Sequence, residues 1–105
     1  MKTLFAALAL TVPFAAAAAD SYTVDPTHTY PSFEINHLGF SITRGSFDKS
    51  EGKITLDTAA KSGSIMITVD TASINTGLGK RDEHLRGEDC FNVTKFPTMT
   101  FKSSK

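Results

Sequence analysis

The residues from Ser64 to Asp70 alternate between apolar and polar positions, and this alternation is the strongest constraint on what the chain can fold into. Ile65, Ile67 and Val69 occupy every second position, and the residues between them are polar apart from Met66. A period of two is that of a β-strand, whose successive side chains point to opposite faces. The segment therefore predicts a half-buried strand with one face that needs a core.

The same alternation recurs in short segments about ten residues apart, which are separated by polar turns. Asp25-Pro26-Thr27 predicts a corner, because proline presets its own backbone angle and aspartate can bond the backbone beyond it. The polar cluster Asp48–Gly52 predicts a hairpin turn that joins residues 40–47 to residues 53–57. We expect an all-β antiparallel domain, a sandwich or a barrel. Its strands are expected at 22–24, 30–37, 40–44, 53–57, 64–70 and 98–103.

One segment departs from the strand pattern. Residues 80–86 contain no β-branched side chain and predict two turns of helix within an insert near residues 80–92. Asp82 and Glu83 lie near the start of this segment, where negative charge favours the helix dipole. The predicted fold is therefore β-rich with a single short helical insert.

The first residues predict a cleaved secretory signal peptide and hence a periplasmic protein. Lys2 precedes an apolar run over residues 4–14, and the alanines at 17–19 form a cleavage site. The apolar run is short for a transmembrane helix, so stable membrane insertion is not expected. Residues 1–19 are assigned to this signal peptide, and the mature domain is assigned to residues 20–105.

Charge and cysteine content narrow the function further. The 11 basic and 11 acidic residues balance, so nothing predicts binding to nucleic acid or to an anionic membrane surface. The single cysteine, Cys90, cannot form an internal disulfide bond, and we expect it to be a packing residue rather than a reactive thiol. The chain ends directly after a strand, which leads us to expect the N-terminal portion of a longer polypeptide, since eight strands are the usual minimum for a barrel that holds a ligand.

An ordered set of short motifs covers nearly the whole mature chain. The motifs are Tyr22–Asp25 with Thr27–Thr29, Phe33–His37, Gly45–Phe47, Gly52–Ile54, Ser73–Gly77, Arg81–Leu85 and Phe96–Phe101. This ordered set resembles the YceI family of periplasmic proteins. The resemblance implies a lipocalin-like antiparallel β-barrel that holds a polyisoprenoid or an isoprenoid quinone in an apolar tunnel. It also implies a full protein of about twice this mature length, and it implies neither catalysis nor a cofactor.

Twelve apolar side chains are candidates for the interior faces of such a barrel. Aliphatic and aromatic groups suit a branched hydrocarbon, although the same groups would equally pack on one another as core. For each residue the two alternatives stay open. The candidates are Phe33, Ile35, Phe40, Ile42, Phe47, Ile54, Leu56, Ile65, Ile67, Val69, Met99 and Phe101.

The polar residues that could contact a ligand or hold a loop are the histidines, Arg81 and Asp82. His37 is expected to end a strand with its ring partly buried, and Asp25 is expected to cap the corner before His28. Arg81, Asp82 and His84, with His37, could hold a lipid head group. Alternatively they form a loop clamp, in which Asp82 accepts from backbone amides and Arg81 pairs with an acid.

The function hypotheses fall into three classes. The leading hypothesis is a carrier for an isoprenoid lipid, with a homodimer as one arrangement and no protein partner identified. The second is a hydrolase or metal-dependent enzyme that uses His28, His37 and His84, although their spacing matches no metal-binding motif. The third is a stress-linked structural or interaction protein without a ligand.

Overall fold

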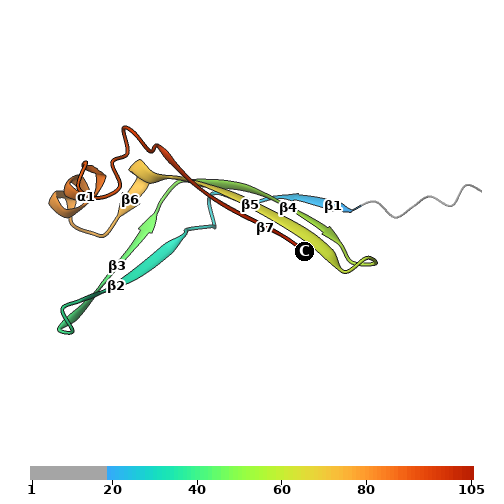
Figure 1. Cartoon of the computed structure of the whole chain (residues 1–105), viewed down its shortest axis with the longest axis horizontal. Helices are drawn as coiled ribbons and strands as arrows, with labels where there is room; N and C mark the ends of the chain where they lie inside the picture. Colours follow the sequence, from blue (N-terminus) through green and yellow to red (C-terminus); the bar gives the residue numbers. More distant parts are fainter. Residues whose placement is uncertain (1–18) are drawn as a thin grey trace, which may run out of the picture.

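The computed structural model describes residues 19–105, and it confirms a mostly β, antiparallel fold with one short helix (Figure 1). The predicted signal peptide lies almost entirely outside the described residues. The elements are β1 (Asp20–Thr23), β2 (Ser32–His37), β3 (Ser41–Phe47), β4 (Ser50–Asp57), β5 (Ser62–Asp70), a 3-10 turn η1 (Thr71–Ser73), β6 (Ile74–Asn75), α1 (Gly79–Arg86) and β7 (Thr98–Ser104).

The strands form two separate antiparallel sheets. One sheet has the order β1-β4-β5-β7, and the other has the order β2-β3-β6. Figure 1 shows the four-stranded sheet as one long arm, the β2–β3 hairpin as a second arm, and α1 beside β6 near the junction. Within residues 19–105 the two sheets do not close into a barrel.

The predicted hairpin between β3 and β4 is wrong, because the two strands belong to different sheets. The polar residues after β3 form a corner that holds a distant segment. The Asp48 carboxylate accepts from the Asn75 side chain at 3.0 Å, and the Asp48 amide donates to the Ser73 carbonyl at 3.0 Å. The Lys49 amide donates to the Ser73 hydroxyl at 3.0 Å. These long-range bonds direct the chain from one sheet into the other.

The core lies where the two sheets meet the helical segment. Phe47, Val69 and Ile74 are its buried residues, and they come from β3, β5 and β6. The Phe47 ring packs edge-on against Phe91, with ring centroids 5.5 Å apart. Four half-buried side chains complete the cluster: Phe33, Ile67, Leu85 and Phe91.

Two glycines make this packing possible. A Cβ atom at Gly45 would lie 2.5 Å from the Phe33 ring, which covers that position. A Cβ atom at Gly52 would lie 2.6 Å from both Ile67 Cδ1 and the Met66 carbonyl oxygen. Each glycine therefore permits an approach that any larger residue would block.

Candidate functional site

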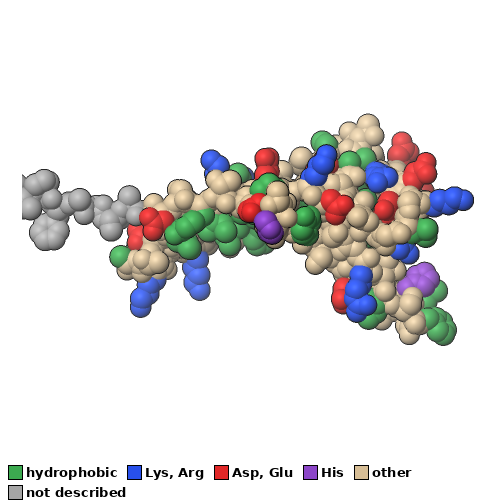
Figure 2. Space-filling model, turned by 180° about the vertical axis from the view of Figure 1, so that it is seen from behind, with side chains coloured by type: hydrophobic (Ala, Val, Ile, Leu, Met, Phe, Trp, Pro, Cys, Tyr) green, Lys and Arg blue, Asp and Glu red, His purple; other side chains and the backbone are tan. Residues whose placement is uncertain are grey.

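One face of the four-stranded sheet is mainly apolar, with Asp20, Ser50 and Ser103 as its polar side chains, and we call its apolar side chains the apolar face. The register places Ile54 opposite Ile65 and Ile67 opposite Phe101. Antiparallel partners share a face, so side chains from all four strands gather there. Figure 2 shows hydrophobic side chains gathered along the arm that this sheet forms. The apolar face consists of Tyr22, Ile54, Leu56, Ile65, Ile67, Val69, Met99 and Phe101.

The exposure of the apolar side chains differs along and across the sheet. Along β5, Val69 beside the core is 5% exposed and Ile65 is 38% exposed, whereas Phe101 on the neighbouring strand β7 is 59% exposed. The opposite face of the sheet carries mainly charged and hydroxyl side chains, and Met66 lies there between Lys53 and Lys102. The sheet is therefore amphipathic, and the outer part of its apolar face is open in residues 19–105.

The twelve apolar candidates from the sequence lie in different parts of the structure. Seven of them lie on the apolar face, from Ile54 to Phe101. Phe33, Ile35 and Phe47 share one face of the β2–β3 sheet and lead into the core. Ile42 pairs with Asn36 on the opposite face, and Phe40 lies in the turn before β3. Ile42 and Phe47 therefore lie on opposite faces of β3, and Phe40 lies outside both strands of the hairpin.

The physical reason is the odd spacing of Ile42 and Phe47. They are five positions apart in a continuous strand, and side chains at an odd spacing point to opposite faces. Sequence reasoning also missed Tyr22, which pairs with Ile54 on the apolar face. The alternation of Tyr22 and Val24 is the signal that could have identified it.

Thr76 connects α1 to the strand before it through a compact hydrogen-bond network. The Thr76 amide and hydroxyl both donate to Asp82 Oδ1, at 2.9 and 2.5 Å. Arg81 Nε donates to the Thr76 hydroxyl at 2.7 Å, and Arg81 Nη2 donates to the Thr76 carbonyl at 2.8 Å. The hydrogen bond from the Thr76 hydroxyl, more than any other cause, holds the pKa of the buried Asp82 below its usual value.

This network confirms that Asp82 accepts from a backbone amide. The prediction that Arg81 pairs with an acid is wrong, because its guanidinium donates to Thr76 instead. The positive charges of Arg86 and Arg81 also favour the ionised form of Asp82. The arrangement is that of a loop clamp that holds α1 over the core.

The three histidines lie in separate parts of the structure. His28 Nδ1 lies 2.8 Å from Asp25 in an exposed corner, where the Thr27 hydroxyl and His28 hold the pKa of Asp25 below its usual value. This confirms Asp25 as the corner cap. His37 ends β2 as predicted, but its side chain is exposed, because the end of the hairpin extends beyond the core.

His84 is exposed on α1, and Cys90 is also exposed rather than packed, since it lies in the turn after the helix. No group of three or more His, Cys, Asp or Glu side chains in residues 19–105 is placed to hold a metal ion. The structure therefore does not bring together the histidine set that the enzyme hypothesis requires.

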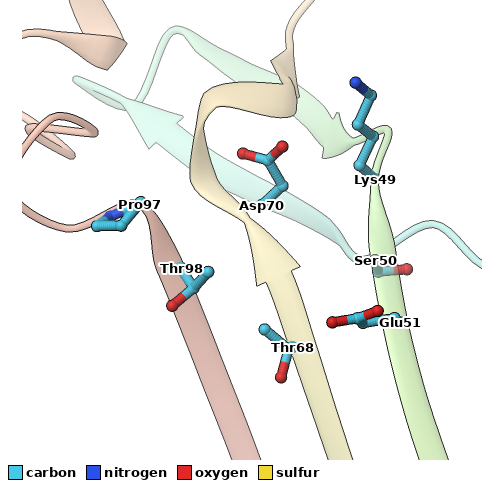
Figure 3. Close-up of a pocket in the computed structure, with 7 residues that line it drawn as sticks. All are labelled: Lys49, Ser50, Glu51, Thr68, Asp70, Pro97 and Thr98. Carbon is cyan, nitrogen blue, oxygen red and sulfur yellow. The ribbon is translucent and has the colours of Figure 1, made fainter.

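A polar surface pocket lies on the face of the four-stranded sheet opposite the apolar face. Its volume is about 330 Å³. Figure 3 shows its lining side chains around the ends of β4, β5 and β7. Carboxylates, hydroxyls and a lysine do not suit a hydrocarbon, so we do not assign a lipid to this pocket. The lining residues are Lys49, Ser50, Glu51, Thr68, Asp70, Pro97 and Thr98.

Comparisons with known proteins agree with this architecture. The chain is 39% identical to a UPF0312 protein of Vibrio cholerae over 99% of its length, and 38% identical to a UPF0312 protein of Shewanella oneidensis over 98%. These alignments cover 58% and 56% of the relatives, so the chain spans a little over half the length of the curated relatives it matches.

Two solved structures share the fold. The crystal structure of Burkholderia cenocepacia BcnA matches 76% of this chain and 50% of that protein, with a TM-score of 0.69 and 28% identity. A mutant CJ YCEI protein matches 80% of this chain and 50% of that protein, with a TM-score of 0.58 and 39% identity.

The fold and the site define a class of antiparallel β protein. One sheet exposes part of its apolar face, and hydrogen bonds from Thr76 and Arg81 hold the short helix α1 in place. The YceI-like domain matches residues 22–105, and the chain belongs to the YceI-like family. Within residues 19–105, no helix is both long enough and apolar enough to cross a membrane.

Proposed function

We propose that the whole protein to which this chain corresponds is a periplasmic, non-enzymatic carrier for an isoprenoid lipid. The apolar face is the observation that carries the proposal. It gathers eight aliphatic and aromatic side chains from four strands and leaves most of them exposed in residues 19–105. Exposed apolar surface of this extent marks a site that another apolar group covers. Membership of the YceI-like family supports a lipid as that group.

The dimensions of the apolar face suit a linear hydrocarbon. From the row of Gly63 to the row of Val69 the sheet extends about 20 Å, at ~3.4 Å per residue. Burial contributes ~0.8 kcal/mol per methylene, so enclosing about a dozen ligand carbons contributes on the order of 10 kcal/mol before ordering costs. Apolar contact therefore supplies affinity without a charged anchor.

The loop clamp holds the core beside the apolar face in place. Asp82 and Arg81 use their side chains to hold Thr76, and α1 in turn places Leu85 against the core. We therefore assign these two residues to positioning of the core that borders the apolar face. His37 and His84, whose side chains are exposed, remain the candidates for contact with a head group.

Lipid extraction from the purified full-length protein, followed by mass spectrometry, tests the proposal. We expect a prenyl lipid at close to one molecule per protein, either as purified or after loading from detergent. A protein that takes up no prenyl lipid under either condition would contradict the proposal. Metal analysis of the same sample tests the alternative, because a stoichiometric transition metal would favour the enzyme hypothesis.

A further inference from the structure

The β2–β3 hairpin ends in two large apolar side chains that contact almost nothing within residues 19–105. Leu38 is 80% exposed and Phe40 is 90% exposed. Figure 1 shows the turn between β2 and β3 at the far end of an arm that projects from the rest of the molecule. We call residues 37–41 the hairpin tip. Two such side chains at a projecting end form an apolar surface that the described fold does not use.

The backbone of the hairpin tip makes the choice of leucine unusual. Leu38 and Gly39 both have positive φ, at 55° and 77°. This combination favours Asn-Gly in tight hairpin turns, because a leucine at positive φ is strained. The turn is nevertheless well bonded: the Phe40 amide donates to the His37 carbonyl at 3.0 Å, and the Gly39 amide donates to the Asn36 side chain at 2.7 Å. The backbone of the turn would favour asparagine at position 38, so the exposed leucine indicates a role outside the fold of residues 19–105.

The charge pattern around the hairpin tip identifies a chemistry for that role. Residues 35–42 contain no lysine, arginine, aspartate or glutamate. The first charged row is Glu34 with Arg44, whose side chains neutralise one another at 2.7 Å. Three strand rows beyond this pair extend about 10 Å, at ~3.4 Å per residue. Amphipathic helices at a bilayer surface bury their apolar face to a depth of ~5–10 Å, and the part of the hairpin beyond Glu34 and Arg44 is about as long.

We propose that the hairpin tip docks reversibly into the interfacial region of a phospholipid bilayer through Leu38 and Phe40. The tip carries no lysine, arginine, aspartate or glutamate into the bilayer, and the Glu34–Arg44 row stays at the water boundary. Ile35 and Phe33 continue from the tip along the face that reaches the buried Phe47. This surface would connect the bilayer to the lipid site. That role of the docked tip rests on the proposed function.

Co-sedimentation of the full-length protein with vesicles tests the docking independently of the proposed function. The vesicles consist of zwitterionic phosphatidylcholine and phosphatidylethanolamine and contain no prenyl lipid. We expect binding that persists in high salt, since no charge carries it. The double variant Leu38→Asn with Phe40→Ser should weaken partition on the order of a hundredfold, because two large side chains no longer enter the bilayer.

The controls separate docking from folding and from association. Leu78→Asn with Phe96→Ser removes a leucine and a phenylalanine that are also exposed elsewhere, and should leave vesicle binding intact. The single variant Leu38→Asn should weaken binding while its melting temperature stays equal or rises, because asparagine suits the positive φ. Failure of the unaltered protein to bind these vesicles would overturn the proposal. Equal weakening of vesicle binding by both double variants would also overturn it. A third contrary result would be a tip variant whose only effect, measured by sedimentation velocity, is to convert a dimer to a monomer.

Prenyl lipid loading from detergent is measured on the same preparations. Vesicle binding without prenyl uptake would refute the proposed function and leave the docking supported. Prenyl uptake without vesicle binding would refute the docking alone.

Discussion

Two adjacent residues on opposite faces of β5 give a direct test of the lipid site. Ile65 lies on the apolar face and is 38% exposed, whereas Met66 lies on the polar face and is 43% exposed. Substituting either by lysine changes a similarly exposed apolar side chain into a charged one. We expect Ile65→Lys to weaken prenyl lipid binding strongly, and Met66→Lys to leave it unchanged.

The magnitude follows from what a bound lipid would cover at Ile65. Full burial of an isoleucine contributes ~1.5–3 kcal/mol, so covering the exposed 38% contributes about 0.6–1.1 kcal/mol, which the variant loses. The introduced ammonium must also leave water or lose its proton. Neutralising a lysine of pKa ~10.4 at pH 7 costs about 4.6 kcal/mol, which is the upper limit of that second contribution. The total lies between about 1 and 6 kcal/mol, depending on how far the lysine reaches back to solvent.

The assay loads both variants of the full-length protein with a defined prenyl alcohol in detergent and quantifies retained ligand by mass spectrometry after gel filtration. Urea unfolding of each variant accounts for any change in stability. A weakening of at least about fivefold for Ile65→Lys alone would support the site, since 1.4 kcal/mol is tenfold. Equal affinity of the two variants would refute the assignment of the ligand to the apolar face.

Three further predictions concern stability. Because hydrogen bonds hold the pKa of folded Asp82 below its usual value, its stabilising effect is present above about pH 4 and is lost as pH falls through the folded pKa. The urea midpoint of unfolding should therefore fall less on acidification for Asp82→Asn than for the unaltered protein. An equal fall for the two proteins would contradict this account. Ile74→Ala should lower the free energy of unfolding by ~2–5 kcal/mol, because Ile74 is buried, whereas the exposed Leu78→Ala should change it by less than ~0.5 kcal/mol. Gly52→Ala should destabilise by ~1–3 kcal/mol in the same assay, and Gly79→Ala, whose Cβ meets open space, should be neutral or stabilising. Equal effects of the two glycine substitutions would refute the packing argument.

The strands with regular alternation were predictable from the sequence. The segment around Ile65, the corner at Asp25 and the helix at Lys80–Arg86 all have strong local signals, and all three are present. The pairing of strands was not predictable, because the polar cluster after Phe47 has the composition of a hairpin turn. Its bonds to Ser73 and Asn75 come from residues more than twenty positions away, and no local pattern records them.

The candidate site was predictable in part for the same reason. Alternation alone assigned Ile65, Ile67 and Val69 to one face, and the register confirms this assignment. Position along the chain did not reveal that Cys90 and His37 are exposed, since burial depends on what packs over a residue. The Thr76 network was also hidden, because it depends on how α1 folds back onto the preceding turn.

By itself, the sequence determined that this chain forms short antiparallel strands, most of them with one apolar face. The reason is that the alternation of side chains along a strand depends only on neighbouring residues. It also determined the family, through motifs that survive in order along the chain. Tertiary structure alone decided which strands lie next to one another and which apolar side chains stay open rather than packed. Those outcomes depend on contacts between residues far apart in the chain, and only the folded arrangement brings such residues together.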